Sequence, residues 1–305
     1  MATTSTGCGS QLRSGRASRR LRLAQEWRLT PWPLISGAGI LGALLMFALL
    51  APVFGSPVHQ DFAHGLSKSG FPIGISARYP LGTDTLGRSM LARLAYGARA
   101  SMVVASVSTV STLTVALAVG VVAGFQRGRT ESALMRLTDV ALAFPAVLVA
   151  LILAALLPAG LFRVLVIITV LFWAYPARIV YSEALRMRSR GFVEAAEASG
   201  SSARATIRRH ILPHLFPLVV SYAPLNAAAA ILFEATLSYL GAGIDPPAAS
   251  WGNMIADGQQ SMSFAPHILL EPSLFLALAV LAFLLLGEGL KARERAISRT
   301  SWLVV

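Results

Sequence analysis

Five histidines and fourteen acidic residues are the side chains of this chain that could bind a metal or transfer a proton. His210 and His214 stand four residues apart, which would place both rings on one helical face, but Pro213 lies between them. No H-E-x-x-H segment of a zinc protease occurs. The only two lysines follow Ser67 and Leu290 rather than glycine, which excludes a phosphate-binding loop. We therefore expect no catalytic residue, metal or cofactor in this chain.

Polar residues that interrupt long apolar runs are the stronger functional candidates. Asp139 lies near one end of the run 138–157, and both Asn226 and Glu234 lie in the run that starts near Leu215. A carboxylate in lipid is costly, so each acid must face the protein interior or a watery path. We consider all three residues candidates for a pathway or gate. A helix–helix hydrogen bond, or a protonated acid that only packs, is the alternative for the two acids.

A charged, alanine-rich segment separates two of the apolar runs. Residues 191–200 have the pattern of a short helix that ends before Gly200, because glycine is preferred just beyond a helix C-terminus. Ser201 or Ser202 can cap a second short helix, and Pro213 is expected to limit that helix. The pattern predicts a helix, a tight turn and a helix.

Physical reasoning leaves two uses of this segment open. Ala195 and Ala196 make the first helix thin enough to fit a partner's groove, and Glu194 with a second acid three residues later could pair with basic groups of that partner. Alternatively, the segment lies on lipid headgroups, a use that Arg208 and Arg209 would support.

The elements that must position these residues are apolar helices. The chain is 55% hydrophobic and only 13% charged, with a mean hydropathy of +0.65, whereas soluble domains carry about 25% charged residues. Apolar runs cover 34–54, 101–125, 138–157, 161–181, about 215–233 and 272–289. At about 1.5 Å per residue each can cross a hydrocarbon core of about 30 Å. We predict an all-α, polytopic membrane protein with six transmembrane helices.

Several residues in the runs are expected to shape the helices. Pro145, Pro176 and Pro224 each remove a backbone hydrogen bond and are expected to kink their spans. Gly120 and Gly124, four residues apart, permit a close helix approach.

Two arginines bound the short fourth run. Arg163 and Arg178 lie at its two ends and are expected to snorkel toward the membrane surfaces.

The distribution of basic residues predicts the topology. Of the 26 Lys and Arg residues, 20 lie in the first tail, in 126–137, in 178–209 and at the C-terminus, so the positive-inside rule places both termini in the cytoplasm. The net charge of +12 is dispersed between spans, which argues against nucleic acid. The expected parts are a basic cytoplasmic tail (1–32), a first transmembrane helix (33–55), an extracytoplasmic loop (56–97), a transmembrane core (98–290) with a cytoplasmic loop (182–214), and a cytoplasmic tail (291–305).

The segment from Glu194 to Pro213 resembles the EAA loop of permease subunits of ABC importers. The family pattern is E-A-A, three residues, G, nine residues, then I-x-L-P. Glu194, Ala195, Ala196 and Gly200 match, and Pro213 stands thirteen residues after the glycine. A departure is the histidine that precedes "ILP", where isoleucine is common.

Two further stretches are similar to the dipeptide/oligopeptide (and nickel) branch of that family. They are "PLGTDTLGRSMLARLAYGARAS" at 80–101 and "FEATLSYLGAGIDPPAASWGNMI" at 233–255. The similarity runs colinearly over about 80–290. The end of the last span, "LLLGEGLKARERA", departs from the family's N-x-x-G-D-G-L-R-D form.

The resemblance implies a type I ABC importer transmembrane domain in a bacterial inner (plasma) membrane. The implied partners are a second homologous permease, two ATP-binding cassette domains that hold ATP and Mg, an extracytoplasmic substrate-binding protein and membrane lipid. The implied ATPase-coupling residues are Glu194, Ala195, Ala196, Gly200, Leu212 and Pro213. Short peptides are the expected substrate class, and nickel chelates, haem and glutathione stay open. The alternative is a stand-alone secondary transporter or channel. Such a protein needs an internal ion or proton relay, and two isolated carboxylates would form a poor one.

Overall fold

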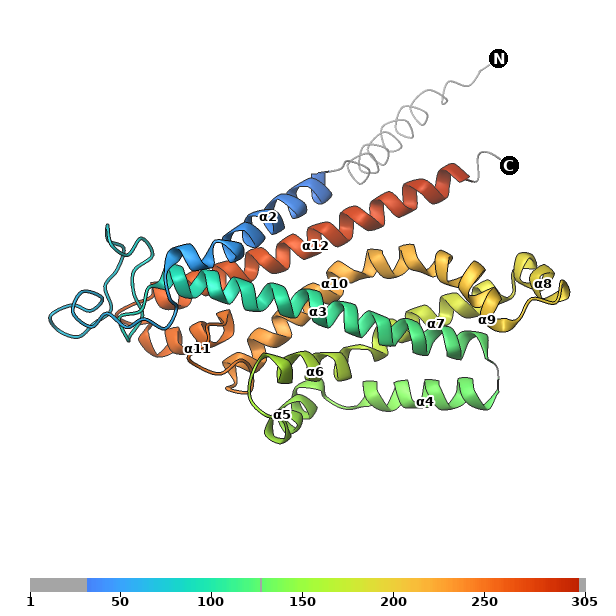
Figure 1. Ribbon diagram of the computed structural model, residues 1–305, viewed down its shortest axis with the longest axis horizontal. Helices are drawn as coiled ribbons and strands as arrows, with labels where there is room; N and C mark the ends of the chain where they lie inside the picture. Colours follow the sequence, from blue (N-terminus) through green and yellow to red (C-terminus); the bar gives the residue numbers. More distant parts are fainter. Residues whose placement is uncertain (1–31, 127, 302–305) are drawn as a thin grey trace, which may run out of the picture.

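A computed structural model describes residues 32–126 and 128–301 (Figure 1). The described elements are α2 (Trp32–Leu49), η1 (Ala51–Phe54), α3 (Met90–Phe125), α4 (Arg129–Ala143), α5 (Ala146–Leu156), α6 (Leu161–Phe172), α7 (Ala174–Arg188), α8 (Gly191–Ala198), α9 (Ala203–Thr206), η2 (Ile207–Ile211), α10 (Leu212–Tyr239), α11 (Trp251–Ser261) and α12 (His267–Ser301). Within these ranges β structure is limited to two isolated bridges, so the all-α prediction is confirmed. Residues 1–31 of the expected tail lie outside the described residues.

The six predicted spans correspond to four long helices and two bent pairs. Four described helices are long and apolar enough to cross a membrane, and the number rises to 6 if each bent pair is one span. The third run is divided at Phe144–Pro145, where α4 and α5 meet at 91°. The fourth run is divided near Trp173, where α6 and α7 meet at 41°. The kink expected at Pro145 is confirmed, and Pro176 lies in the first turn of α7, just after the second break.

Three predicted boundaries also change. The first span ends as an α-helix at Leu49 and continues as the 3₁₀ turn η1, which holds Pro52 in its first turn. The loop expected at 56–97 ends earlier, because Ser89 caps α3 by accepting a hydrogen bond from the Ala92 N–H. The C-terminal segment 291–305 is helical as far as Ser301, as a continuation of α12.

Glycines determine how closely the long helices pack. Figure 1 shows α2 beside α12 and α3 beside α7 along the length of the molecule. A Cβ added at Gly120 would lie 2.7 Å from the Ala177 carbonyl oxygen, and one added at Gly124 would lie 2.7 Å from the Ala184 Cβ. The close approach predicted from these two glycines is confirmed, and α7 is the partner helix.

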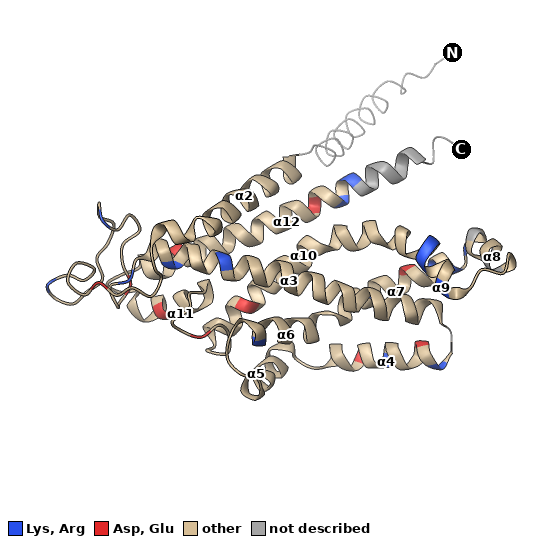
Figure 2. Cartoon of the chain, in the orientation of Figure 1, with Lys and Arg blue, Asp and Glu red and all other residues tan. Residues whose placement is uncertain are grey.

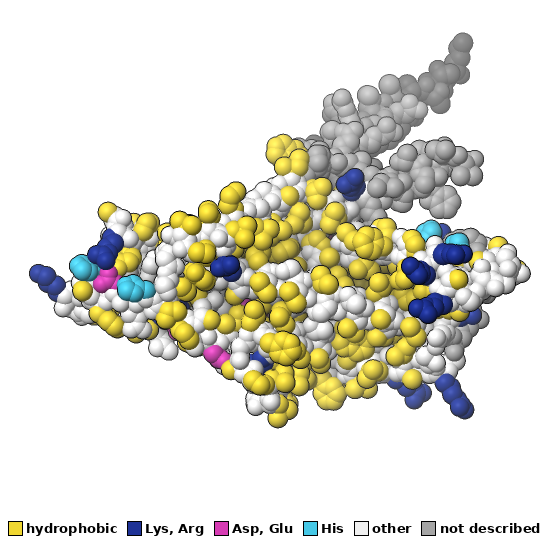
Figure 3. All heavy atoms as spheres, viewed as in Figure 1, with side chains coloured by type: hydrophobic (Ala, Val, Ile, Leu, Met, Phe, Trp, Pro, Cys, Tyr) yellow, Lys and Arg dark blue, Asp and Glu magenta, His cyan; other side chains and the backbone are white. Residues whose placement is uncertain are grey.

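The surface is apolar across the middle of the molecule. Figure 3 shows hydrophobic side chains over this middle zone, and dark-blue basic side chains toward the ends. The cartoon in Figure 2 shows basic residues around α9 at one end and in the loop at the other. A protein with this surface fits a bilayer, because lipid covers the apolar zone and water meets the charged ends.

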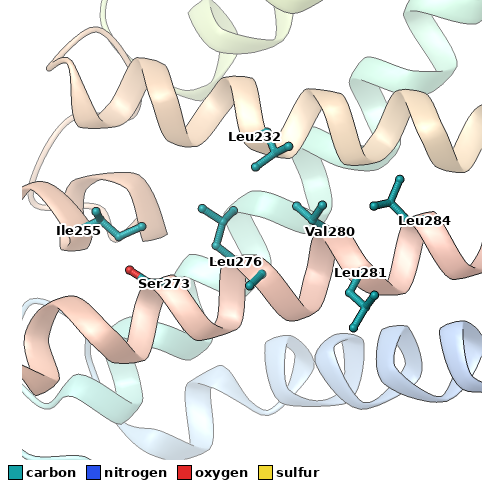
Figure 4. Close-up of a pocket in the computed structure, with 8 residues that line it drawn as sticks. Leu232, Ile255, Ser273, Leu276, Val280, Leu281 and Leu284 are labelled. Carbon is teal, nitrogen blue, oxygen red and sulfur yellow. The ribbon is translucent and has the colours of Figure 1, made fainter.

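A lateral groove of about 430 Å³ lies between α10, α11 and α12 (Figure 4). Its walls are aliphatic, with Leu232, Leu276 and Leu284 among them. Ser273 is the one polar residue among those described along this groove, and its hydroxyl donates to the Leu269 carbonyl at 2.7 Å. The groove therefore presents hydrocarbon to whatever lies beside it.

The loop 55–89 is anchored by a carboxylate. Asp61 accepts hydrogen bonds from the Tyr79 hydroxyl at 2.8 Å, from Arg78 at 2.9 Å and from the His64 N–H at 3.0 Å. The bond from Tyr79, aided by those from His64 and by the charge of Arg78, lowers the pKa of Asp61 to about 2.

Replacing Asp61 by asparagine should therefore loosen the loop. The carboxylate's pKa is below its ordinary value of 3.8, so its stabilising effect is present above about pH 4 and is lost as the pH falls toward about 2. At neutral pH the Asp61→Asn variant should show faster hydrogen exchange at the amides of His64 and Gly65, with exchange in α12 unchanged. Equal exchange in both proteins would contradict this role.

The stretches 80–101 and 233–255, which resemble family motifs, pack against each other. The Trp251 indole donates to the Leu94 carbonyl at 3.2 Å, and a Cβ at Gly97 would lie 2.8 Å from the same ring. Arg93 contacts Asp84 at 3.4 Å and Asp257 of α11 at 3.8 Å. These motif residues thus join α3 to α11.

Candidate functional site

The charged segment forms the predicted helix, turn and helix. After α8, Gly200 adopts a left-handed conformation with φ of 78°, and the Ser201 N–H bonds the Ala196 carbonyl at 3.1 Å. A bond that reaches back five residues across a left-handed glycine is a Schellman-type helix end. Ser202 caps α9 by accepting from the Ala205 N–H at 3.3 Å. The roles of Gly200 and Ser202 in the backbone are confirmed.

Among the side chains that the structure describes in this unit, Val193 and Thr206 are buried and most of the others are exposed. Val193 is fully buried and packs with Met187 and Ile211. Ala195 and Gly200 are exposed and Ala196 is half-buried. Figure 1 shows α8 and α9 projecting at the end of the molecule opposite the loop 55–89. The side chain of Glu194 lies outside what the structure describes.

Pro213 does not end the second helix, which corrects the prediction. The chain continues from α9 through the π-turn η2 into α10, and the Leu212 N–H bonds the Ile207 carbonyl, five residues back. Proline has no N–H to donate, and its ring needs room beside the preceding turn. The wider π-turn accommodates both the missing donor and the ring. Leu212 is half-buried and Pro213 is exposed. The α8–α9 unit is therefore continuous with α10.

A second groove lies where the two broken spans meet α10. Its walls hold Phe144 and Ala146 from the first break, Tyr175 and Pro176 from the start of α7, and Tyr222 and Asn226 from α10. It encloses about 290 Å³. None of the described residues along it is charged. We call it the break groove.

Asn226 is the polar residue of the break groove that lacks a partner. It is only 6% exposed, and its Oδ1 accepts no hydrogen bond from the described residues. The rings of Tyr175 and Tyr222 lie 6.2 Å apart between centroids and bring two hydroxyl-bearing side chains to the same groove. The structure thus places the candidate Asn226 beside a cavity.

The other two candidates lie elsewhere. Asp139 forms an ion pair with Arg178, which links α4 to α7, and both side chains are about half exposed. Glu234 is fully buried and accepts a hydrogen bond from the Ser238 hydroxyl at 2.7 Å. It faces the protein interior and does not line the break groove.

Arg163 is held by other parts of the protein, and Arg178 is held by its ion pair with Asp139. Arg163 is 8% exposed and donates to the carbonyls of Ala154 and Gly243, at 3.2 and 2.7 Å. The Asp245 carboxylate also lies 3.5 Å from this guanidinium, so two carbonyls and a carboxylate hold the charge. Among the described residues no group of three His, Cys, Asp or Glu side chains is arranged to hold a metal.

Sequence reasoning missed Tyr175 and Tyr222. They lie in apolar runs that resemble any other span, and Tyr175 stands next to a proline that was itself recognised as a kink. An aromatic hydroxyl beside a predicted helix break was the available signal, because broken helices line cavities in membrane proteins.

Known proteins are similar to this chain over most of its length. Residues 116–293 match the family model "Binding-protein-dependent transport system inner membrane component". The chain is 32% identical over 252 residues to the oligopeptide transport system permease protein OppC of Haemophilus influenzae, covering 83% of this chain and 80% of the relative. It is 32% identical over 255 residues to OppC of Bacillus subtilis, covering 84% and 82%.

A relative whose name gives another solute is also similar to this chain. The glutathione transport system permease protein GsiD of Pectobacterium atrosepticum is 33% identical over 218 residues, which cover 72% of each chain. The apolar helices and these relatives agree on a multi-pass inner-membrane protein. The chain belongs to the binding-protein-dependent transport system inner membrane components and is a permease subunit of an ABC importer.

Proposed function

We propose that this chain forms half of the translocation pathway for short peptides. A second homologous permease forms the other half, and two ATP-binding cassette domains that bind ATP and Mg drive transport. An extracytoplasmic binding protein delivers the solute. Membership of the permease family carries the proposal, and the names of the oligopeptide relatives support the substrate class.

In this proposal both termini and the segment 182–214 are cytoplasmic, and 56–97 faces the binding protein. The excess of arginine and lysine in the former segments supports that orientation. The ordered network around Asp61 supports a loop that presents a fixed surface.

The exposed α8–α9 unit is the proposed ATPase-docking site. Its helix α8 holds Ala195 and Ala196, and its turn holds Gly200. The unit continues into α10 at Leu212 and Pro213. An ATPase movement that displaces the unit would therefore act on the helix that holds Asn226. Such coupling needs a partner whose contacts with the unit differ between two states.

Purification in mild detergent tests the assembly. We expect two ATPase subunits and a second permease to co-elute with the tagged chain, and vesicles containing the complex to take up labelled peptide only with ATP and binding protein. Uptake by the purified chain alone would contradict the proposal and favour a secondary transporter, an alternative that the relatives do not support.

Neutralising Asp139 should weaken the connection between α4 and α7. Half-exposed ion pairs contribute about 0.2–1 kcal/mol, so Asp139→Asn should lower peptide uptake by about fivefold at most. The exchanged pair Asp139→Arg with Arg178→Asp should recover part of the loss in a double-mutant cycle. Purely additive effects of the two single substitutions would show that the pair has no role.

A further inference from the structure

We propose that the break groove binds the backbone of the transported peptide and that Asn226 pairs with an amide N–H of that backbone. This inference rests on the proposed function and assigns the substrate contact within the pathway. It follows from an unpartnered oxygen, from the helix ends around it and from the absence of charge along the described walls.

The first observation is the buried Asn226 oxygen. Its side chain is 6% exposed, and Oδ1 has no hydrogen bond among the described residues. A buried acceptor without a partner costs about 1–3 kcal/mol. An amide oxygen accepts from an N–H or O–H group, and Asn226 lines the groove. A solute N–H that reached this oxygen, after rotation of the side chain toward the groove, would remove that cost.

The second observation is that one helix ends and the next begins beside the groove. α4 ends at Ala143 and α5 begins at Ala146, which lines the groove. The last carbonyls of a helix and the first N–H groups of the next have no partners within their helices. Irregular backbone is tolerated at membrane depth where it borders a cavity. A peptide backbone, with alternating donors and acceptors, complements such a wall.

The remaining walls of the groove are uncharged, so the charge of a peptide side chain would not determine whether the peptide binds there. Phe144, Tyr175 and Tyr222 supply aromatic surface, and no charged side chain is found among the described residues that line the groove. Peptides of different sequence share their amide groups, and aromatic walls accept varied apolar and polar side chains. The groove of Figure 4 differs, because its only described polar side chain already bonds a carbonyl of its own helix.

The test uses the whole complex in proteoliposomes with saturating, peptide-loaded binding protein. The Asn226→Leu variant keeps the side chain's approximate size and removes both amide functions. We expect its peptide uptake to fall about tenfold, the loss of one hydrogen bond, while the loaded binding protein stimulates ATP hydrolysis within about twofold of wild type. Gln260→Leu, which removes an exposed amide on α11, is the matched control and should leave both rates unchanged.

A peptide N-methylated at each inner amide in turn provides the second arm. Wild-type complex should transport at least one methylated peptide about tenfold more slowly than the parent when both are fully bound to the binding protein. Asn226→Leu should remove that difference. If the variant still discriminates, the asparagine pairs with a group of the partner permease and the proposal is wrong.

Two other results would also overturn it. Wild-type uptake in Asn226→Leu would show that the amide is not used, and joint loss of uptake and of ATPase stimulation would show a role in folding or coupling instead. If wild-type complex lacks ATP-dependent peptide uptake, the proposed function itself fails, and this result is obtained before any variant is compared.

Discussion

Peptide uptake should fall by at least about tenfold when Gly200 is replaced by aspartate, while the amount of the chain in the membrane stays within about twofold of wild type. Gly200 holds φ of 78° between α8 and α9, a conformation that costs an L-residue about 1–2 kcal/mol. A Cβ added there meets nothing within 4 Å. The subunit itself can thus accept the side chain, and the damage falls on the turn and on the partner that docks against it.

Gly128 provides a matched control. It has φ of 85° and also has open space at the Cβ position, but it stands in the turn before α4, outside the docking unit. Gly128→Asp should keep uptake within about twofold of wild type because it lies outside the docking unit, although its backbone (φ 85°, ψ −132°) is at least as unfavourable for an L-residue. Equal losses of uptake in both variants would show that backbone strain alone causes the effect. Normal uptake in Gly200→Asp would remove the docking role from this turn.

Glu194→Lys should give the same phenotype for another reason. Its charge reversal would set a cation where the family resemblance implies an acid, so the ATPase subunits should no longer co-elute with the chain. Retention of both ATPase subunits and full uptake would contradict the assignment of the loop.

Replacing Gly120 by leucine should strongly destabilise the packing of α3 against α7. The added Cβ would lie 2.7 Å from the Ala177 carbonyl oxygen and 2.7 Å from the Val180 Cβ, so α3 and α7 must separate. Overpacking of this kind costs about 1–3 kcal/mol or more. We expect the variant to fall below about a tenth of the wild-type amount in the membrane, and Gly120→Ala to unfold at a lower mole fraction of SDS.

Gly42 supplies a control at which the change from glycine to alanine is expected to stabilise the protein. It lies in α2, and nothing stands within 4 Å of an added Cβ. In a helix, alanine is favoured over glycine by about 1 kcal/mol, so Gly42→Ala should unfold at an equal or higher fraction of SDS. If Gly120→Ala also became more stable, the close contact between α3 and α7 would have no energetic importance.

Local patterns were sufficient for some of these features. Apolar runs of 18 or more residues identify spans because hydrogen bonding and lipid leave few alternatives to a helix. Gly200 and Ser202 follow from rules that involve only their near neighbours, and the structure agrees with both. Gly120 and Gly124 predicted a close contact without revealing that α7 makes it.

The prolines show why the rest was not predictable from pattern. Pro145 stands at a 91° bend, Pro224 lies within the continuous helix α10, and Pro213 follows a π-turn. All three remove one N–H, but the result depends on which distant segments pack beside them. Arg163 likewise finds the Gly243 carbonyl, 80 residues away. The break groove combines residues from three runs, so no single segment indicates it.

The right-angle turn after α4 has a consequence for how far this part of the chain reaches across a bilayer. The 15 residues of α4 rise only about 22 Å, against about 30 Å of hydrocarbon, and α5 then turns by 91°. Where α4 stands upright, α5 runs in the plane of the membrane instead of completing the crossing.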